Sequence, residues 1–394
     1  MNSYSVLIFL SLLVIISYVF NLFARSWKLP AVLLLLGLGI LLRYVGIYFG
    51  FEINNIQPYL ELFGIVGLIL IVLEASLDLK VNRFSIPIVT KSLEVAFLVL
   101  VLGFSGIACL LHFWLLVGWR VACINSIPLA VISSAIVIPS VAHLSHKKKE
   151  FLIYESTLSD ILGILLFNFL IHHEIASFNS AVNFIGILMI TILVSVVSSL
   201  FLLYLIAKIK DHVKIFIILS VMILLYSLGK LLHLSPLLLI FVFGVLLSNY
   251  EHFFRNRFAF IRNLSLETDF SEFKLVVAES SFVIRTFFFV MFGYSIDLSM
   301  IANREVLLIG SAVVFILVFV RYIYLKYFAR IDIFPELFIA PKGLVSILLF
   351  YSIPAQSVIP SVSRGVLFYV IFVSSILMAA ALFVDHRKSV KGLV

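Results

Sequence analysis

The chain is dominated by a series of apolar stretches, most of them about twenty residues long, separated by short polar connections. A helix needs about 20 apolar residues to cross a hydrocarbon core of roughly 30 Å. We therefore predict an all-α polytopic membrane protein with thirteen transmembrane segments. They lie at roughly residues 4–23, 29–49, 59–77, 92–117, 121–143, 152–173, 183–206, 213–232, 236–249, 276–296, 305–326, 334–354 and 366–384. The ninth is short and is either tilted, re-entrant or longer than these limits.

The composition agrees with a membrane protein and excludes other classes. Of the 394 residues, 63% are hydrophobic and 12% are charged. A soluble fold of this size cannot bury so much apolar surface, and disordered chains have far less. Cys109 and Cys123 suggest neither a disulfide framework nor a metal site. No basic residue precedes the first apolar run, so we expect no cleavable signal, and we also expect no soluble regulatory domain and no cofactor.

The net charge of +8 would suit nucleic acid, but in so apolar a chain we interpret it as a record of topology. With the N-terminus outside and the C-terminus inside, 19 of the 28 Lys and Arg residues fall in inner loops and the C-terminal tail. The other nine are four in outer loops, Arg120, Lys230, Arg304 and Arg364, and five within or at the ends of spans, Arg43, Lys91, Arg285, Arg321 and Lys342. We predict an N-out, C-in, multi-pass protein of the cell (inner or plasma) membrane, with the lipid bilayer and not nucleic acid as a partner.

Two segments in opposite halves of the chain, 121–143 and 334–354, are interrupted by helix breakers. These are Pro128 and Pro139 on either side of Ser133 and Ser134 in the first, and Pro335, Pro341, Gly343 and Pro354 in the second. The two segments run in opposite directions across the membrane, which is typical of an inverted-repeat transporter. Unwound backbone at membrane depth is tolerated only where it is buried or faces a cavity. Ordinary proline kinks in structural helices are the alternative.

Asp160 is the main candidate for the transport site. It lies about eight residues, or ~12 Å, into its segment, near the centre of the hydrocarbon core. Charge at this depth is costly, by at least ~2.5 kcal/mol, and is therefore a functional hypothesis by default. One carboxylate can hold either a proton or a cation but gains little from holding both, which is the minimal chemistry of an exchanger. A buried Asp that only bonds a neighbouring helix is the alternative.

Other charged residues lie within the predicted spans or at their ends. Glu155 and Arg321 have similar predicted depths in the inner leaflet, so they either form an ion pair or Arg321 extends to the headgroups. Glu74 is either a gate, an additional oxygen ligand or a structural residue, and Asp78 shares its helix face at i+4. Arg285 either lines the cavity or pairs with Glu279. Glu94 and Lys91 are expected to form an interfacial pair, at residues 91–94.

Several motifs, taken together, resemble the monovalent cation:proton antiporter superfamily over nearly the whole chain. They are Glu155-Ser156-Thr157-Leu158-Ser159-Asp160, which is similar to the family's Glu-Ser-x-x-Asn-Asp; Leu73-Glu74-Ala75-Ser76-Leu77; Phe287 to Gly293 followed by Asp297; Arg321; and Ala340-Pro341-Lys342-Gly343-Leu344-Val345, which is similar to Ala-Pro-Arg-Gly-Leu. None of these matches is specific alone, but five in order on the expected helices are.

The resemblance implies a 13-helix fold and a homodimer, with core helices at about 92–173 and 305–384 and the remaining helices serving as dimerisation scaffold. It implies that Asp160 carries the cation or proton, and that Ser156, with main-chain oxygens near Ser133 and Ser134, helps to bind the ion. Glu155 would pair with Arg321. Pro139, Pro341, Lys342 and Gly343 belong to the broken helices.

This chain departs from the family at two positions, both of which reduce the charge of the site. Ser159 stands where relatives carry Asp or Asn before the essential Asp, and Ser134-Ala135-Ile136 stands where one branch has Thr-Asp-Pro. With one carboxylate we predict a secondary active, electroneutral 1:1 antiporter by alternating access, for Na⁺ or possibly K⁺ or Li⁺. Potassium-efflux relatives lack the Asp pair too, so a transporter or channel of that type is the alternative.

Other readings of the sequence are weaker. Gly103-Phe104-Ser105-Gly106 fits the motif of intramembrane serine proteases, but no His lies convincingly at the depth of Ser105, so we expect helix packing and no enzyme or catalytic residue. The histidines nearest to such a role, His172, His173 and His233, lie at the outer ends of their segments. His143 and His146, near the inner face, could instead tune the response of transport to pH. The connection 250–275, Phe-rich at its start, is typical of an interfacial amphipathic helix.

Overall fold

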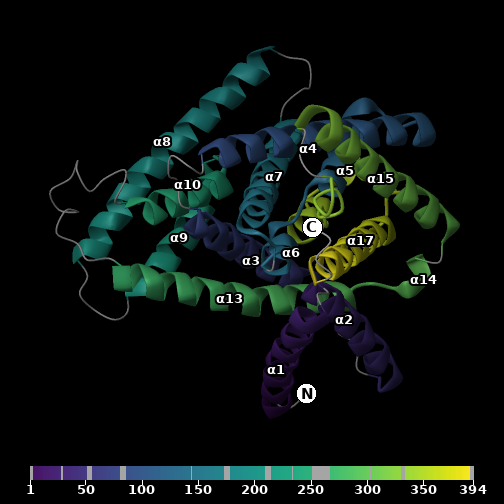
Figure 1. Ribbon diagram of the computed structural model, residues 1–394, viewed down its shortest axis with the longest axis horizontal. Helices are drawn as coiled ribbons and strands as arrows, with labels where there is room; N and C mark the ends of the chain where they lie inside the picture. Colours follow the sequence, from purple (N-terminus) through teal and green to yellow (C-terminus); the bar gives the residue numbers. More distant parts are fainter. Residues whose placement is uncertain are drawn as a thin grey trace. The chain divides into compact units, whose positions relative to one another are not determined.

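The computed structural model describes residues 3–27, 30–50, 56–79, 86–142, 144–172, 178–208, 214–232, 234–250, 267–301, 303–329 and 333–390, and most of these residues are helical (Figure 1). Two compact units divide the chain: one comprises residues 1–64, 89–171 and 283–394, and the other 65–88 and 172–282. The predicted core ranges 92–173 and 305–384 fall in the first unit except for residues 172 and 173, and that unit also contains 1–64 and 283–304.

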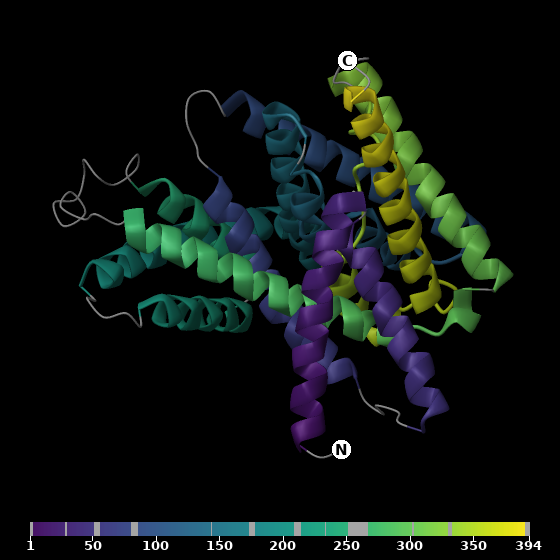
Figure 2. The same ribbon diagram turned by 60° about the horizontal axis from the view of Figure 1, so that its bottom comes forward.

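The first unit contains most of the helices. They are α1 (Ser3–Trp27), α2 (Ala31–Tyr48), α4 (Ile86–Leu115), α5 (Trp119–Ala130), α6 (Ser134–Ser140), α7 (His146–His172), α14 (Leu298–Ile301), α15 (Arg304–Ile323), the π-helix η1 (Tyr324–Ala329), α16 (Leu344–Tyr351), the 3₁₀ turn η2 (Ala355–Ser357) and α17 (Arg364–Val390). Helices α15 and α17 run side by side, as Figure 2 shows. Helix α13 (Glu267–Tyr294) begins in the second unit and ends in the first.

The second unit is built from α8 (Phe178–Lys208), α9 (Lys214–Leu231) and α10 (Pro236–Ser248), with most of α3 (Gln57–Asp78). Helix α10 packs on both α8 and α9 (Figure 1). Its C-terminal end satisfies orphan carbonyls of α3, because Ser248 donates to Leu77 and Asn249 donates to Leu79, both at 2.8 Å. Lys274 pairs with Asp78 at 2.5 Å near the same helix end.

The predicted segments can be compared with these helices. Within the described residues, eight helices are long and apolar enough to cross a membrane, and three shorter apolar helices accompany them. Every predicted segment contains a helix, although that of 334–354 begins only at Leu344, and the short ninth segment is the 13-residue α10. The count of thirteen crossings and the N-out, C-in orientation stay predictions.

The first interrupted segment is helix, extended chain and helix. Helix α5 ends at Ala130, residues 131–133 are extended, and α6 starts at Ser134. Each backbone N–H from 131 to 134 has an acceptor: the Ile127 carbonyl, the Ser159 hydroxyl, the Pro341 carbonyl and the Asp160 carboxylate, in that order. The interruption therefore survives away from water because neighbouring segments replace the lost helical bonds.

The second interrupted segment is helical only in its second half. Residues 334–338 form turns, 339–343 have no regular secondary structure, and α16 follows. The non-helical stretches of the two segments meet directly, since the Ser133 N–H donates to the Pro341 carbonyl at 2.9 Å. Gly343 is required at this contact, because a Cβ there would lie 2.6 Å from the Ser133 Oγ. Gly163 of α7 likewise faces the Val131 side chain with no room for a Cβ.

A second close approach joins α2 to the end of α13. A Cβ on Gly293 would meet the backbone of α2, whereas one on Gly37 would meet no atom within 4 Å. Arg43 of α2 pairs with Asp297, just beyond α13, at 3.4 Å. Hydrogen bonds from the hydroxyl and N–H of Ser299, with a smaller contribution from the Arg43 charge, lower the pKa of Asp297 below its usual value, and desolvation only partly opposes them.

The glycines around Ser105 serve helix packing. A Cβ on Gly106 would lie 2.8 Å from the Ile316 side chain, and one on Gly103 would lie 3.2 Å from Leu317. Both partners belong to α15, so the glycines of α4 let these helices approach. His143, His173, His233 and residues 251–266 lie outside the described residues, as does the side chain of His172.

Candidate functional site

Asp160 of α7 lies against the start of α6, where the first helix is interrupted. Its side chain is 1% exposed. Its Oδ2 accepts hydrogen bonds from the Ser134 N–H at 3.0 Å and from the Ser134 hydroxyl at 2.5 Å. The other oxygen, Oδ1, is buried and has no hydrogen-bond partner among the described residues. One face of this carboxylate is therefore anchored, while the other is available to an ion or a proton.

The other predicted ligand serines also lie here, but they differ in what their oxygens do. The Ser133 Oγ is buried and has no hydrogen-bond partner within the described parts of the chain. The Ser159 Oγ accepts from the Ile132 N–H at 3.0 Å, so it satisfies a backbone donor between α5 and α6. Ser156, one turn before Asp160, donates to the Leu152 carbonyl of its own helix at 2.8 Å. Each hydroxyl oxygen keeps at least one lone pair.

Glu155 and Arg321 form a buried, two-pronged ion pair. The two guanidinium nitrogens Nη1 and Nη2 donate to the two carboxylate oxygens, and both residues are 1% exposed. The Nε and Nη2 of Arg321 also donate to the carbonyl of Glu336, at 3.1 and 3.0 Å. Arg321 is thus enclosed by protein, which leaves no room for the alternative in which it extends to the headgroups.

Lys342, in the non-helical stretch before α16, is a further buried basic residue. Its Nζ donates at 2.7 Å to the carbonyl of Ala130, the last residue of α5. Its backbone N–H donates to the Ser374 hydroxyl. A cation at this position compensates the partial negative charge of a helix C-terminus. Lys342 therefore joins the two interrupted helices in the same way that Ser133 and Pro341 do.

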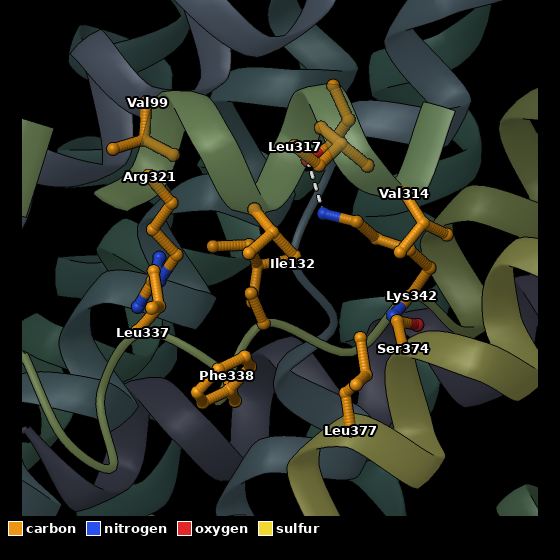
Figure 3. Close-up of a pocket in the computed structure, with 13 residues that line it drawn as sticks. Val99, Ile132, Val314, Leu317, Arg321, Leu337, Phe338, Lys342, Ser374 and Leu377 are labelled. Atoms are coloured by element: carbon orange, nitrogen blue, oxygen red, sulfur yellow. Dashed lines mark hydrogen bonds between the residues drawn. The ribbon is translucent and has the colours of Figure 1, made fainter. Parts of the chain in front are cut away.

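A small cavity of about 30 Å³ lies beside this crossing, with room for about two water molecules. Arg321 and Lys342 are the charged residues of its lining, and Ile132 lies between them in the view of Figure 3. The rest of the lining is almost entirely apolar. The dashed line in Figure 3 is the bond from Lys342 to α5.

The remaining predicted positions are spread over both units. Glu74 lies in the second unit, where its carboxylate accepts from the Ser281 hydroxyl at 2.7 Å. Arg285, in the first unit, donates to the Ala135 carbonyl of α6 at 3.3 Å. Lys91 pairs with Glu94 at 3.1 Å, as expected for neighbours on one helix face. Pro139 lies within α6.

The sequence analysis missed Glu336. Its carboxylate is buried and pairs with Lys148 of α7 at 3.0 Å. The signal that would have found it is the same one that found Asp160, namely an acidic residue in a predicted span.

The chain matches the family model described as sodium/hydrogen exchanger, transmembrane, over residues 8–384. This chain belongs to the sodium/hydrogen exchanger family. Among curated proteins, none matches it. The family is one of transporters and not enzymes, and membership makes the chain a multi-pass membrane protein and supports cation/proton antiport.

Solved structures show the same fold for this exchanger. One is that of the sodium proton antiporter MjNhaP1 from Methanocaldococcus jannaschii at pH 8, with 19% identity, a TM-score of 0.74, and coverage of 96% of this chain and 97% of that one. A second structure of MjNhaP1 has 19% identity, a TM-score of 0.70, and coverage of 100% and 97%. The all-α fold with interrupted helices is therefore that of a known antiporter.

Proposed function

We propose that this exchanger moves one Na⁺ against one proton by alternating access at Asp160. The observation that carries the proposal is the unequal hydrogen bonding of the two carboxylate oxygens of Asp160. Oδ2 is held by Ser134, whereas Oδ1 is buried and has no hydrogen-bond partner among the described residues. A proton or a cation at Oδ1 would neutralise the same charge, so the two compete. Competition at one site that opens alternately to each side produces exchange.

The ion would take further oxygen ligands from the first interruption. Ser133, with its buried hydroxyl, and nearby main-chain carbonyls are the candidates, together with Ser134 and Ser156. Ser159 is a weaker candidate because its oxygen already accepts from the backbone. The Glu155–Arg321 pair would brace α7 without binding the ion. That Glu74 acts as a gate or an additional ligand stays a prediction.

The test is a pH-gradient dequenching assay in proteoliposomes, run with Na⁺, K⁺ and Li⁺. Asp160→Asn keeps the size of the side chain and one acceptor oxygen but removes the charge, so exchange is expected to fall to the level of empty liposomes. The matched control is Glu305→Gln, an exposed acid in the first turn of α15, which is expected to keep full exchange. Full activity of Asp160→Asn would overturn the assignment.

The stoichiometry has a separate test. Because Ser159 replaces a possible second carboxylate, each cycle is expected to move no net charge. A Na⁺ gradient across proteoliposomes is then expected to generate no current on a supported membrane. A sustained current that Asp160→Asn abolishes would rule out 1:1 exchange while leaving the site intact.

We also propose that the exchanger is a homodimer in the cell membrane, which rests on the family resemblance. Light scattering of the purified protein in detergent, corrected for bound detergent, is expected to give twice the chain mass of 44.4 kDa. A single chain mass would refute the dimer.

A further inference from the structure

The connection between α4 and α5 contains a leucine in a backbone conformation that favours glycine. Leu116 has a φ of 53°, in the left-handed region, where a Cβ lies too close to the following carbonyl oxygen. Leu116 is also 87% exposed, so its side chain makes few contacts with the protein. Packing of this side chain within the chain therefore does not offset the strain, whereas a partner outside the chain would.

Aromatic rings on both sides fix the shape of this connection, which we call the aromatic turn and define as residues 112–120. The His112 ring stacks on Trp119 with 4.1 Å between the ring centroids, and its Nδ1 donates to the Val117 carbonyl at 2.7 Å. Phe113 meets Trp119 edge-on at 5.9 Å. The end of α4 is thus joined to the start of α5, and Leu116 is held between them in its exposed position.

The surface of the aromatic turn is apolar and continues along α4. Phe113 is 70% exposed, and Trp114 and Trp119 are each about half exposed. Further along α4, the exposed apolar side chains are Leu93, Phe97 and Leu102. A helix that crosses a membrane contacts lipid through such side chains, and Trp is enriched where the lipid chains meet the headgroups.

The length of α4 places the aromatic turn at one interface of the membrane. At the other end of this helix, Glu94 pairs with Lys91 and accepts from the Tyr324 hydroxyl at 2.7 Å. Charged side chains and tyrosine are typical of a membrane interface. Trp114 follows Glu94 by twenty residues, or ~30 Å of helix, which equals the thickness of the hydrocarbon core. The aromatic turn therefore lies at the opposite interface, on the predicted outer side.

The charge of the aromatic turn suits a phospholipid. Arg120 is exposed, and the hydrogen bond that ties it to the protein runs from its Nη2 to the Ile171 carbonyl of α7 at 3.0 Å. A guanidinium has five N–H donors, so others are left for phosphate oxygens. The same bond connects the turn to the end of the helix that carries Asp160.

We propose that the aromatic turn is a lipid anchor, with Leu116 and the tryptophan rings inserted at the boundary between headgroups and acyl chains of the predicted outer leaflet. The anchor holds the ends of α4, α5 and α7 at a fixed depth. A lipid fits better than a protein partner, because the apolar surface of the turn is continuous with that of a membrane-spanning helix. The inference rests on the membrane placement of the family and not on the ion site.

The experiment measures the depth of a single tryptophan. The chain has three tryptophans, so Trp27→Phe with Trp119→Phe leaves Trp114 as the only one and keeps an aromatic ring beside His112. The variant is reconstituted in vesicles of phosphatidylcholine and phosphatidylglycerol. Its fluorescence is quenched either by lipid brominated near the carbonyl end of the acyl chain, by lipid brominated near the chain end, or by aqueous iodide.

The proposal predicts the strongest quenching by lipid brominated near the carbonyl end, and weak quenching by iodide. Strong quenching by iodide with weak quenching by both lipids would place the turn in water and overturn the proposal. Protection from all three quenchers would mean that a second copy or another protein covers the turn, which also overturns it. Adding Asp160→Asn is expected to leave the pattern unchanged, so this test and that of the proposed function fail separately.

Leu116→Gly separates anchoring from folding. Glycine accepts the left-handed conformation, so in detergent this variant is expected to unfold at the same temperature as its parent or a higher one. Without the leucine, quenching of Trp114 by lipid brominated near the carbonyl end is expected to fall at least about twofold. The matched control is Gly118→Ala, in the same turn with no atom within 4 Å of the added methyl group, which is expected to change neither quantity. A lower unfolding temperature with unchanged quenching would show that Leu116 serves the fold, and the proposal would be wrong.

Discussion

Replacing Arg321 by Met tests the reasoning about the buried Glu155–Arg321 pair. The substitution leaves the Glu155 carboxylate and the Glu336 carbonyl buried without the donors that now satisfy them. Loss of one partner of a buried pair costs about 3–5 kcal/mol. With an unfolding entropy of roughly 2.1 cal/mol/K per residue over 394 residues, the unfolding temperature is expected to fall by about 4–6 °C.

The assay is thermal unfolding of the purified exchanger in detergent, followed by tryptophan fluorescence. The double variant with Glu155→Gln removes both charges and is expected to be more stable than Arg321→Met alone. The exposed Lys91–Glu94 pair supplies the control, because Lys91→Met is expected to cost under about 1 kcal/mol. If the two single losses simply add in the double variant, to within about 0.5 kcal/mol, the two side chains are not coupled and the reasoning is wrong.

Three further variants test two close helix contacts and the Asp297 carboxylate. Gly163→Ala would press a methyl group against Val131 at the first interruption. Exchange in the dequenching assay is therefore expected to fall at least tenfold, and the free energy of unfolding, measured by thermal unfolding, is expected to drop by about 1–3 kcal/mol. Gly293→Ala meets backbone and is expected to lose about 1–3 kcal/mol, whereas Gly37→Ala, with open space, is expected to lose none; equal melting temperatures would contradict this. Asp297, with its lowered pKa, stabilises the fold above its unfolded-state pKa and loses this effect as the pH falls through its folded value, so Asp297→Asn is expected to show a smaller drop in unfolding temperature between pH 7 and pH 3 than the wild type.

The parts of the site that the sequence predicted are those that violate a strong physical rule. Asp160, Glu155 and Arg321 are charges within apolar segments, and such residues are rare enough to stand out. The two interruptions were visible as Pro and Gly in otherwise apolar runs. The rule identifies the residues but not their partners, and the pairing of Arg321 was left open until its buried contacts were known.

The rest of the site depends on contacts between distant segments. Nothing in the sequence indicates that Ser159 would cap the Ile132 N–H, because a serine beside an essential acid is equally consistent with a ligand. Lys342 was predicted only as part of a broken helix, and its bond to Ala130 is a tertiary contact. Glu336 was missed although it, like Asp160, is an acidic residue within a predicted apolar segment.

The crossing of the two interrupted helices has a consequence for biosynthesis. Lys342 and Ala130 are 212 residues apart, so the first interruption emerges from the ribosome long before the residues that complete it. Until then the Ser133 N–H and the Ala130 carbonyl have no partner from the second half, and such groups are costly inside a bilayer. The first five segments are therefore expected to insert into the membrane without their final packing. The ion site is then completed in one of the last steps of assembly.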